Sequence, residues 1–242
     1  MVADMKVLAP MPAWKRAIDV ALCIAALPAL ALCTLAMTIA MQFGSPGPVF
    51  FRQERVGFGG RRFKCYKFRT MTVGADTTTH QAYFSHLIGS NTPMAKLDSR
   101  GDSRLVPGGW LLRASGLDEL PQLINVLRGE MSLVGPRPCL PYEYQQYLPW
   151  HRKRFNATPG LTGLWQVSGK NRTTFEEMIH LDIEYSETKT LWLDVKIMAL
   201  TIPALLFQVS DIRRIRSGAT VQSLEIIPAD GTKSIFNTRK LS

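Results

Sequence analysis

A long apolar stretch near the beginning of the chain constrains the fold more than any other feature. Residues 17–43 read AIDVALCIAALPALALCTLAMTIAMQF and carry a single charged side chain, Asp19. As a helix the stretch is about 40 Å long, enough to cross a bilayer core of about 30 Å. It is too long for a cleaved signal peptide, and no small-residue cleavage site precedes a domain of exported character. The sequence therefore predicts a helix that enters a membrane.

Pro28 lies near the middle of this stretch and leaves two topologies open. Proline removes a helix hydrogen bond and favours a kink. Basic residues flank both ends of the stretch, with Lys15 and Arg16 before it and a run of arginines and lysines in residues 52–69 after it. Positive charge marks the cytoplasmic side of a membrane. A helix that bends at Pro28 and returns keeps both groups inside, whereas a straight span exports one of them.

A second apolar segment occupies residues 191–209. Asp194 and Lys196 leave only residues 197–209 uncharged, which we expect to be too short to span a bilayer. The segment suits an interfacial helix, with the basic run RRIR at residues 213–216 resting on anionic headgroups. It suits equally a core helix with a solvated basic end.

The pattern elsewhere indicates a mainly helical α+β fold. The breaker GSPGP at residues 44–48 ends the first apolar stretch, and alternation around GFGG in residues 48–71 predicts a short β-hairpin. We divide the chain into a membrane region (1–46), a catalytic domain (47–210) and a polar tail (211–242). Further elements are expected as helices at 117–127, 143–154 and 174–188, a structured loop at 159–165, and a long excursion at 72–109 with a short helix at 81–88.

Charge and cysteine usage narrow the class of partner. The net charge of +10 predicts a negatively charged partner such as nucleic acid, anionic lipid or a phosphorylated substrate. The cysteines form no C-x-x-C pair, so we expect neither a disulfide framework nor a zinc site, and free thiols fit a reducing, cytosolic location. The histidines have no metal-ligand spacing.

The segment LDELPQL, residues 117–123, places two carboxylates just before a proline. Proline is tolerated in a helix only in its first turn, so Pro121 predicts a helix that begins within residues 117–120. Asp118 and Glu119 then lie where free backbone N–H groups and the helix dipole favour carboxylate or phosphate. Taken alone, the pair is explained as an N-cap and an ordinary first-turn acid.

Basic residues in nearby segments favour a catalytic role for the acidic pair over a purely structural one. Gly135 permits close backbone approach, and Pro136 and Pro138 hold the intervening arginine of GPRP in an extended segment. Arginine forks and lysine charges suit phosphate oxygens. A carboxylate pair among such groups suggests phosphoryl transfer, in which one acid attacks phosphorus and the other holds Mg²⁺. The candidate phosphate-binding residues are Lys67, Arg69, Arg113 and Arg137.

Several blocks of the chain resemble the bacterial sugar transferases, the monotopic phosphoglycosyl transferases that start glycan assembly. The blocks are KRAIDV, QERVG…FKCYKFRTM, LDELPQLINVLRGEMSLVGPRP and PGLTGLWQVSGKNR…LDIEYS…LWLDVKI. The resemblance runs from Trp14 to Gln208 and is most specific from DELPQ to GPRP. The short exopolysaccharide-initiating members are the most similar.

The resemblance implies a reaction and its site. Members of the family move a sugar-1-phosphate from a UDP-sugar to undecaprenyl phosphate and release UMP. The match implies a covalent phosphosugar intermediate on Asp118, with Mg²⁺ and help in proton transfer at Glu119. It places Lys67, Arg113 and Arg137 at the phosphate site.

The resemblance also implies a membrane topology. It favours a re-entrant helix kinked at Pro28, with Lys15, Arg16 and Asp19 where the chain enters the membrane, and an interfacial helix near Leu191. The expected location is the cytoplasmic face of the bacterial inner membrane. The expected partners are the UDP-sugar, undecaprenyl phosphate and membrane lipids, without nucleic acid. The sequence is also compatible with assembly as a homo-oligomer.

Two departures from the family pattern stand out. Gly116 occupies the position before LDE where the family usually has serine, so a hydroxyl cap is lost unless Ser115 substitutes for it. The tail after Asp211 has no counterpart in the family, and the excursion at 72–109 varies within it. The identity of the sugar is not readable from the sequence.

Two other functions stay open. One is a membrane-anchored basic binding or scaffold protein, which predicts salt-sensitive oligonucleotide binding that survives Asp118→Asn. It leaves the rigid GPRP and DELPQ segments unexplained. The other is a membrane phosphatase with an aspartyl nucleophile, which would release free phosphate without a lipid acceptor.

Overall fold

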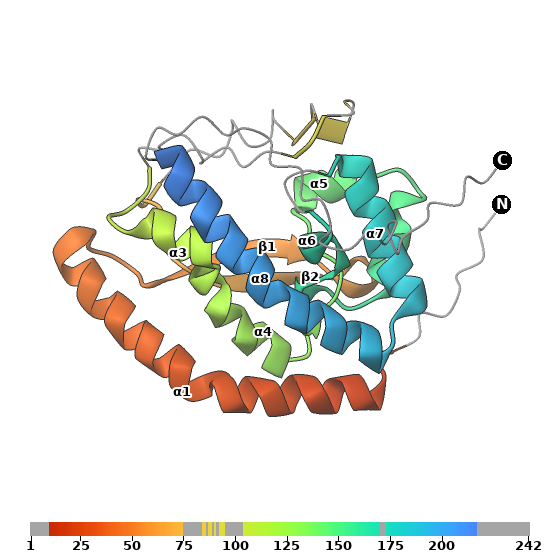
Figure 1. Ribbon diagram of the computed structural model, residues 1–242, viewed down its shortest axis with the longest axis horizontal. Helices are drawn as coiled ribbons and strands as arrows, with labels where there is room; N and C mark the ends of the chain where they lie inside the picture. Colours follow the sequence, from red (N-terminus) through yellow and green to blue (C-terminus); the bar gives the residue numbers. More distant parts are fainter. Residues whose placement is uncertain are drawn as a thin grey trace.

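The computed structural model describes residues 10–74, 84–85, 87–88, 90, 92–94, 104–169 and 173–216. This part of the chain is mainly helical, with two small sheets of two strands each. Figure 1 shows α1 along one side of the molecule, α8 crossing its front, α3 and α4 between them, and the β1–β2 hairpin behind α8. The elements are α1 (Ala13–Gly44), β1 (Phe50–Val56), η1 (Phe58–Gly60), β2 (Arg62–Phe68), α3 (Gly109–Ser115), η3 (Leu117–Gln122), α4 (Leu123–Leu127), β3 (Ser132–Val134), α5 (Pro141–Gln145), η4 (His151–Asn156), β4 (Gly160–Thr162), α6 (Leu164–Val167), α7 (Phe175–Thr188) and α8 (Leu191–Arg216).

The N-terminal apolar helix predicted from the sequence is confirmed as α1, which runs without a break through Pro28. Its axis changes direction partway along, so that two arms meet at an angle in Figure 1. A buried stripe at helical spacing faces the domain and consists of Lys15, Asp19, Cys23, Leu30, Met37 and Met41. The opposite faces carry exposed apolar side chains, among them Leu32 at 69% and Leu35 at 58% exposure. A return to one side of a membrane at Pro28 stays a prediction.

The predicted hairpin is also confirmed. β1 and β2 pair antiparallel from Phe50↔Phe68 to Val56↔Arg62, and Gly59 and Gly60 supply the positive φ angles of the turn. Cross-strand partners project to the same face of a sheet. Phe51 is the partner of Lys67, so alternation places Lys67 in one row with Phe51, Gln53 and Arg55.

The expected helix at 143–154 is wrong. Its place is taken by α5, which ends at Gln145, and by the 3-10 turn η4, which begins at His151. Pro149 lies between them and lacks the N–H that a continuous helix needs. The predicted loop at 159–165 contains β4, which pairs parallel with β3, and the start of α6. The predicted helix at 174–188 is confirmed as α7, with a capping box formed by Thr174 and Glu177.

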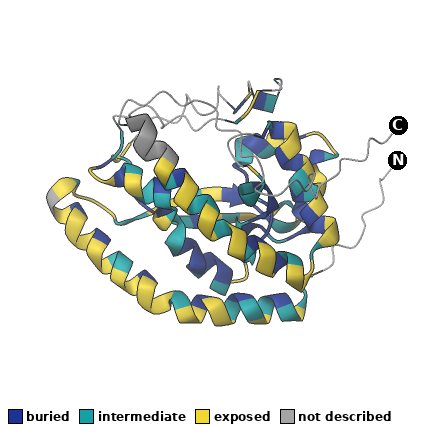
Figure 2. Cartoon of the chain, in the orientation of Figure 1, coloured by how far each residue is buried: buried dark blue, intermediate teal, exposed yellow. Residues whose placement is uncertain are grey.

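The second apolar segment is longer than the sequence argument allowed. It forms α8, which is 26 residues long and continues to Arg216, past the predicted boundary at 210. Two helices, Ala13–Gln42 and Leu191–Ser210, are long and apolar enough to cross a membrane. Little of either apolar window is buried, 11% and 17% respectively. Figure 2 shows the exposed residues along the outer faces of α1 and α8.

This exposure decides between the two interpretations of α8. A core helix hides its apolar side chains, whereas Trp192, Ile202 and Leu206 of α8 are 81%, 65% and 67% exposed. An apolar outer face next to the apolar outer face of α1 favours contact with a membrane. The predicted short helix at 81–88 and the tail from 217 onward lie largely or wholly outside the described residues.

Candidate active site

The acidic pair lies at the start of a helical segment, as Pro121 predicts. η3 begins at Leu117 after Gly116, and α4 continues it to Leu127. The first turns are 3-10 in geometry. Asp118 is buried, with 8% exposure, whereas the Glu119 side chain is 38% exposed.

Gly116 has a structural role that explains its presence before the pair. Its φ of 74° lies in the left-handed region that favours glycine, and its carbonyl accepts from the Glu119 N–H at 3.0 Å. The hydroxyl of Ser115 lies 3.5 Å from the Leu117 nitrogen. Ser115 thus stands at the place where the sequence suggested a substitute cap, at the long limit of a hydrogen bond.

Lys67 reaches the acidic pair from the hairpin. Its Nζ lies 2.6 Å from Oε1 of Glu119, and the two side chains are 23% and 38% exposed. The contact joins β2 to η3 across 52 residues of sequence. The row defined by Lys67, Phe51, Gln53 and Arg55 therefore leads from the acidic pair along one face of the hairpin.

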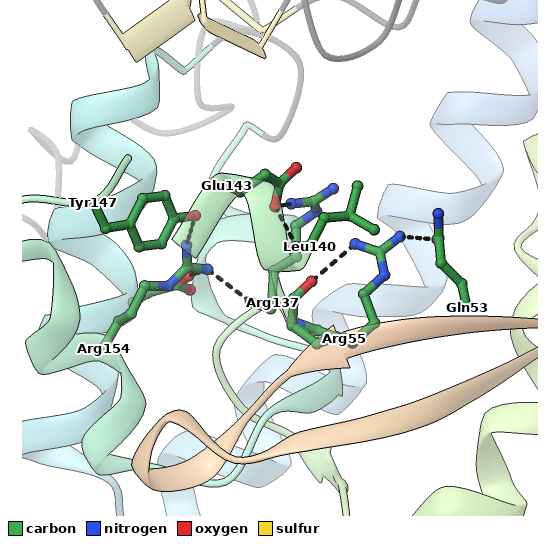
Figure 3. A network of polar contacts seen from close by, with 9 residues as sticks. Gln53, Arg55, Arg137, Leu140, Glu143, Tyr147 and Arg154 are labelled. Atoms are coloured by element: carbon green, nitrogen blue, oxygen red, sulfur yellow. Dashed lines mark hydrogen bonds and ion pairs between the residues drawn. The ribbon is translucent and has the colours of Figure 1, made fainter. Parts of the chain in front are cut away.

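The far end of this row meets the GPRP segment, residues 135–138 (Figure 3). Arg55 donates to Gln53 Oε1 at 2.7 Å and to the carbonyl of Pro138 at 3.1 Å. Four residues of strand separate Phe51 from Arg55, a length of about 14 Å. The acidic pair and GPRP thus border the two ends of one strand face.

The GPRP segment is fixed by its backbone. Carbonyls along it accept hydrogen bonds from partners far away in the sequence, at Val134, Pro136, Arg137, Pro138 and Cys139. A Cβ on Gly135 would lie 2.2 Å from the Thr158 oxygen and 2.8 Å from the Gly160 nitrogen. Only glycine fits such a close backbone crossing, which confirms the close approach expected of Gly135.

Buried charged side chains hold the GPRP segment in place. Arg154 forms a buried ion pair with Asp182 and donates to Tyr147 Oη at 2.9 Å and to the Arg137 carbonyl at 2.8 Å. Glu143, with 0% exposure, accepts from the Leu140 N–H at 2.8 Å and lies 3.5 Å from the Arg137 guanidinium. Figure 3 shows Arg137 and Arg55 on either side of Leu140, with Glu143 next to Arg137.

The cluster holds more positive than negative charge. Among the described residues, Arg55, Arg137 and Arg154 face two carboxylates, Glu143 and Asp182. Burial, together with the neighbouring Arg137, lowers the pKa of Arg55 from its ordinary value. Burial opposes the charge on Arg137 as well, but Glu143 and Tyr147 together outweigh it and raise the Arg137 pKa. Because the Arg137 side chain is 28% exposed, an anion can reach the excess charge.

The other two predicted basic residues, Arg69 and Arg113, make backbone contacts with or near the two long helices. Arg69 is buried and donates to the carbonyls of Pro48 and Ser45 and to the Ser45 hydroxyl, where α1 ends. This contact satisfies carbonyls near the C-terminus of α1; a phosphate-binding role for Arg69 stays a prediction. Arg113 is half-buried in the last turn of α3, and its carbonyl accepts from Gln208 of α8 at 3.1 Å.

Lys15, Arg16 and Asp19 contact the domain. Lys15 and Asp19 are 3% and 2% exposed, so neither lies in solvent or headgroups. Lys15 pairs with Asp194 of α8, Arg16 reaches the end of α4, and Asp19 accepts from the backbone before GPRP.

Sequence reasoning missed several residues that shape the site, namely Gln53, Arg55, Glu143, Arg154 and Asp182. The first two carried a signal, since alternation in the hairpin puts them on the face of Lys67. Glu143, Arg154 and Asp182 lie in α5, η4 and α7. In the sequence they look like ordinary charged residues on the exposed faces of helices, so only their charge could have pointed to them.

The acidic pair fits a magnesium ion in part. Mg²⁺ keeps several waters and binds proteins through one or two carboxylates together with substrate phosphates. Glu119 supplies an accessible carboxylate of this kind, although one of its oxygens is already paired with Lys67. No cluster of three or more metal-ligating side chains occurs among the described residues, so a metal here would depend on phosphate and water oxygens.

Two apolar outer helices suggest membrane association, and the acidic pair and the cationic cluster lie at opposite ends of one hairpin face. The bacterial sugar transferase family matches residues 11–208. The chain therefore belongs to this family, and it is an enzyme of the transferase class.

Named relatives agree with this assignment. The exopolysaccharide production protein ExoY of Sinorhizobium fredii is 37% identical over 191 residues, which cover 79% of this chain and 84% of the relative. The UDP-glucose:undecaprenyl-phosphate glucose-1-phosphate transferase of Caulobacter vibrioides is 40% identical over 200 residues, covering 79% and 69%. The galactosyl transferase CpsE of Streptococcus agalactiae is 41% identical over 161 residues, but the match covers only 35% of that longer protein.

Proposed function

We propose that this protein transfers a sugar-1-phosphate from a UDP-sugar to undecaprenyl phosphate, releasing UMP and starting exopolysaccharide or related glycan synthesis. The relatives named for glucose-1-phosphate and galactose transfer to undecaprenyl phosphate support this reaction class. The single observation that carries the proposal is the acidic pair at the start of η3, with Lys67 2.6 Å from Glu119 and Asp118 buried beside it.

In the first step a carboxylate oxygen of Asp118 attacks the β-phosphorus of the UDP-sugar. A bond from this oxygen to phosphorus forms, the bond to the bridging oxygen breaks, and UMP leaves. Lys67, Arg113 and Arg137 bind the phosphate oxygens. The excess charge of the Arg55–Arg137 cluster suits phosphate oxygens.

In the second step a phosphate oxygen of undecaprenyl phosphate attacks the phosphorus of the phospho-aspartate. The new bond makes the lipid diphosphate sugar, and Asp118 regains its carboxylate. Glu119 assists proton transfer and holds Mg²⁺, which when bound screens phosphate charge.

The membrane helices bring the lipid acceptor to this site. The exposed apolar face of α1, the bend visible in Figure 1 and Pro28 support a helix that enters the membrane and returns to the same side. α8 rests at the interface beside it. This topology keeps both ends of α1 and the whole site on the cytoplasmic face of the inner membrane.

The test is UMP release by purified protein in nanodiscs with Mg²⁺, undecaprenyl phosphate and a panel of UDP-sugars. We expect UMP from at least one donor, turnover only with the lipid, and a loss of at least about 10³-fold in Asp118→Asn. A phosphosugar adduct on the peptide that contains Asp118, seen by mass spectrometry without acceptor, would establish the intermediate.

Other outcomes would replace the proposal. Free phosphate released without lipid would indicate a phosphatase. Undiminished UMP release in Asp118→Asn would remove Asp118 as the nucleophile. Salt-sensitive oligonucleotide binding that survives this substitution, with no UMP from any donor, would indicate a binding protein.

A further inference from the structure

The first turns of α1 contact the two segments that form the site. Arg16 is the clearest case. Its guanidinium donates to the carbonyl of Val126 at 2.5 Å and to that of Leu127 at 2.6 Å, two of the last carbonyls of α4. A cation at a helix C-terminus satisfies orphan carbonyls and the helix dipole together. α4 continues η3 directly, so the segment whose last turn Arg16 binds carries Asp118 and Glu119 in its first turn.

Lys15 and Asp19 act on the segment that leads into GPRP. Lys15 Nζ lies 2.5 Å from Asp194 of α8, and the other oxygen of Asp194 accepts from Tyr185 Oη at 2.7 Å. Tyr185 Oη in turn lies 3.1 Å from the Val134 carbonyl, one residue before Gly135. Asp19 accepts from the Leu133 N–H at 3.0 Å.

These contacts are unlike those of a membrane anchor. Basic residues that set topology lie in water or among headgroups, whereas Lys15 is 3% exposed and its ion pair joins elements 179 residues apart. α1 thus meets the acidic segment through Arg16 and the GPRP segment through Lys15 and Asp19.

We propose that Arg16 is a positioning residue for the acidic pair, and that Lys15 and Asp19 position GPRP in the same way. The base of the membrane helix then sets the distance between the nucleophile and the phosphate-binding arginine. This inference rests on the proposed function, which supplies the reaction that the positioning serves.

Arg16 can affect the acidic pair because it holds the opposite end of the same short helical segment. Residues 117–127 form one helical unit of about 20 Å, at about 2.0 Å per residue in η3 and about 1.5 Å per residue in α4. A tilt at its held end moves the carboxylates at the other end. A displacement of about 1 Å from the productive geometry can cost about 10²-fold in rate without a change in substrate contacts.

Arg16→Lys is the decisive variant. Lysine keeps the positive charge that topology requires, but its single ammonium lacks the planar fork that binds both carbonyls. We expect kcat for UMP release to fall about tenfold or more, while the KM for the UDP-sugar stays within about twofold and the membrane-bound fraction is unchanged. Arg62→Lys is the matched control, because the Arg62 side chain is 58% exposed and pairs with Glu54 at the hairpin end.

Hydrogen–deuterium exchange gives a readout that does not depend on activity. In Arg16→Lys we expect faster exchange across residues 117–127 and unchanged exchange in α7, which excludes general unfolding. Ile24→Ser, on the exposed face of α1 at 57%, is the membrane control and should reduce membrane binding without affecting exchange in that segment.

The outcomes separate the two proposals. Unchanged exchange and kcat in Arg16→Lys would overturn the positioning role, as would a loss of activity that follows the membrane-bound fraction. If the wild type releases no UMP but exchange in residues 117–127 still rises in the variant, the positioning stands and the proposed reaction fails.

Discussion

The two halves of the site are built differently. The GPRP half is buried, since the side chains of Arg154 and Asp182 are 0% and 1% exposed. Its backbone is held in place, because five carbonyls from Val134 to Cys139 accept hydrogen bonds from distant residues. The acidic half is more open at Glu119, whose ion pair with Lys67 has side chains 38% and 23% exposed, whereas Asp118 is buried. The rigid half can hold a phosphate in a fixed place, whereas the open half can exchange partners during a reaction.

This comparison predicts opposite effects of substitution in the two halves. Changes behind GPRP should lower stability strongly, because they leave buried charges or backbone without partners. Changes at the acidic pair should lower activity while stability stays nearly the same.

The largest loss of stability is expected for Arg154→Leu. Leucine leaves Asp182 buried without its cation and removes two further hydrogen bonds. We expect a cost of about 3–5 kcal/mol in the free energy of unfolding, measured by thermal or denaturant unfolding in detergent. A variant as stable as the wild type would show that this ion pair does not fix the GPRP half.

Gly135→Ala should have the next largest effect, a loss of about 3 kcal/mol in the free energy of unfolding. The added Cβ meets two backbone atoms, the Thr158 oxygen and the Gly160 nitrogen, and neither can move aside without shifting the β3–β4 pair. The midpoint of thermal unfolding reports the change. Gly108→Ala is the control, since a Cβ there meets nothing within 4 Å and adds only the strain of its positive φ.

Gly116→Ser introduces the serine that is usual in the family and should lower the free energy of unfolding by about 1 kcal/mol. A side chain at φ of 74° is strained, and its Cβ lies 3.1 Å from the flexible end of Leu205. A higher unfolding temperature would mean that the segment prefers another conformation before Asp118. UMP release by this variant then shows whether that conformation is the productive one.

Lys67→Met should have the smallest effect on stability, about 0.5 kcal/mol or less, because a half-exposed ion pair is screened by solvent. UMP release should nevertheless fall by about tenfold or more, since a phosphate contact is lost. Parallel measurements of unfolding and rate test the comparison directly. A large stability loss with normal activity would reverse the roles assigned to the two halves.

Much of the fold followed from local rules. The apolar run, the GFGG turn and the position of Pro121 predicted α1, the hairpin and the start of η3. The expected helix at 143–154 failed because its hydrophobic spacing continued across Pro149. The predicted end of the second apolar helix was too early, because α8 continues to Arg216.

By itself, the sequence determined the apolar helices, the alternation of the hairpin and the chemical types gathered in DELPQ and GPRP. These depend on spacings of two to four residues, which any chain expresses locally. Only the tertiary structure decided which charges meet. The pairs Lys67–Glu119, Arg154–Asp182 and Lys15–Asp194 join residues 52, 28 and 179 positions apart. Such pairs depend on how helices and strands pack, and no local pattern records that packing.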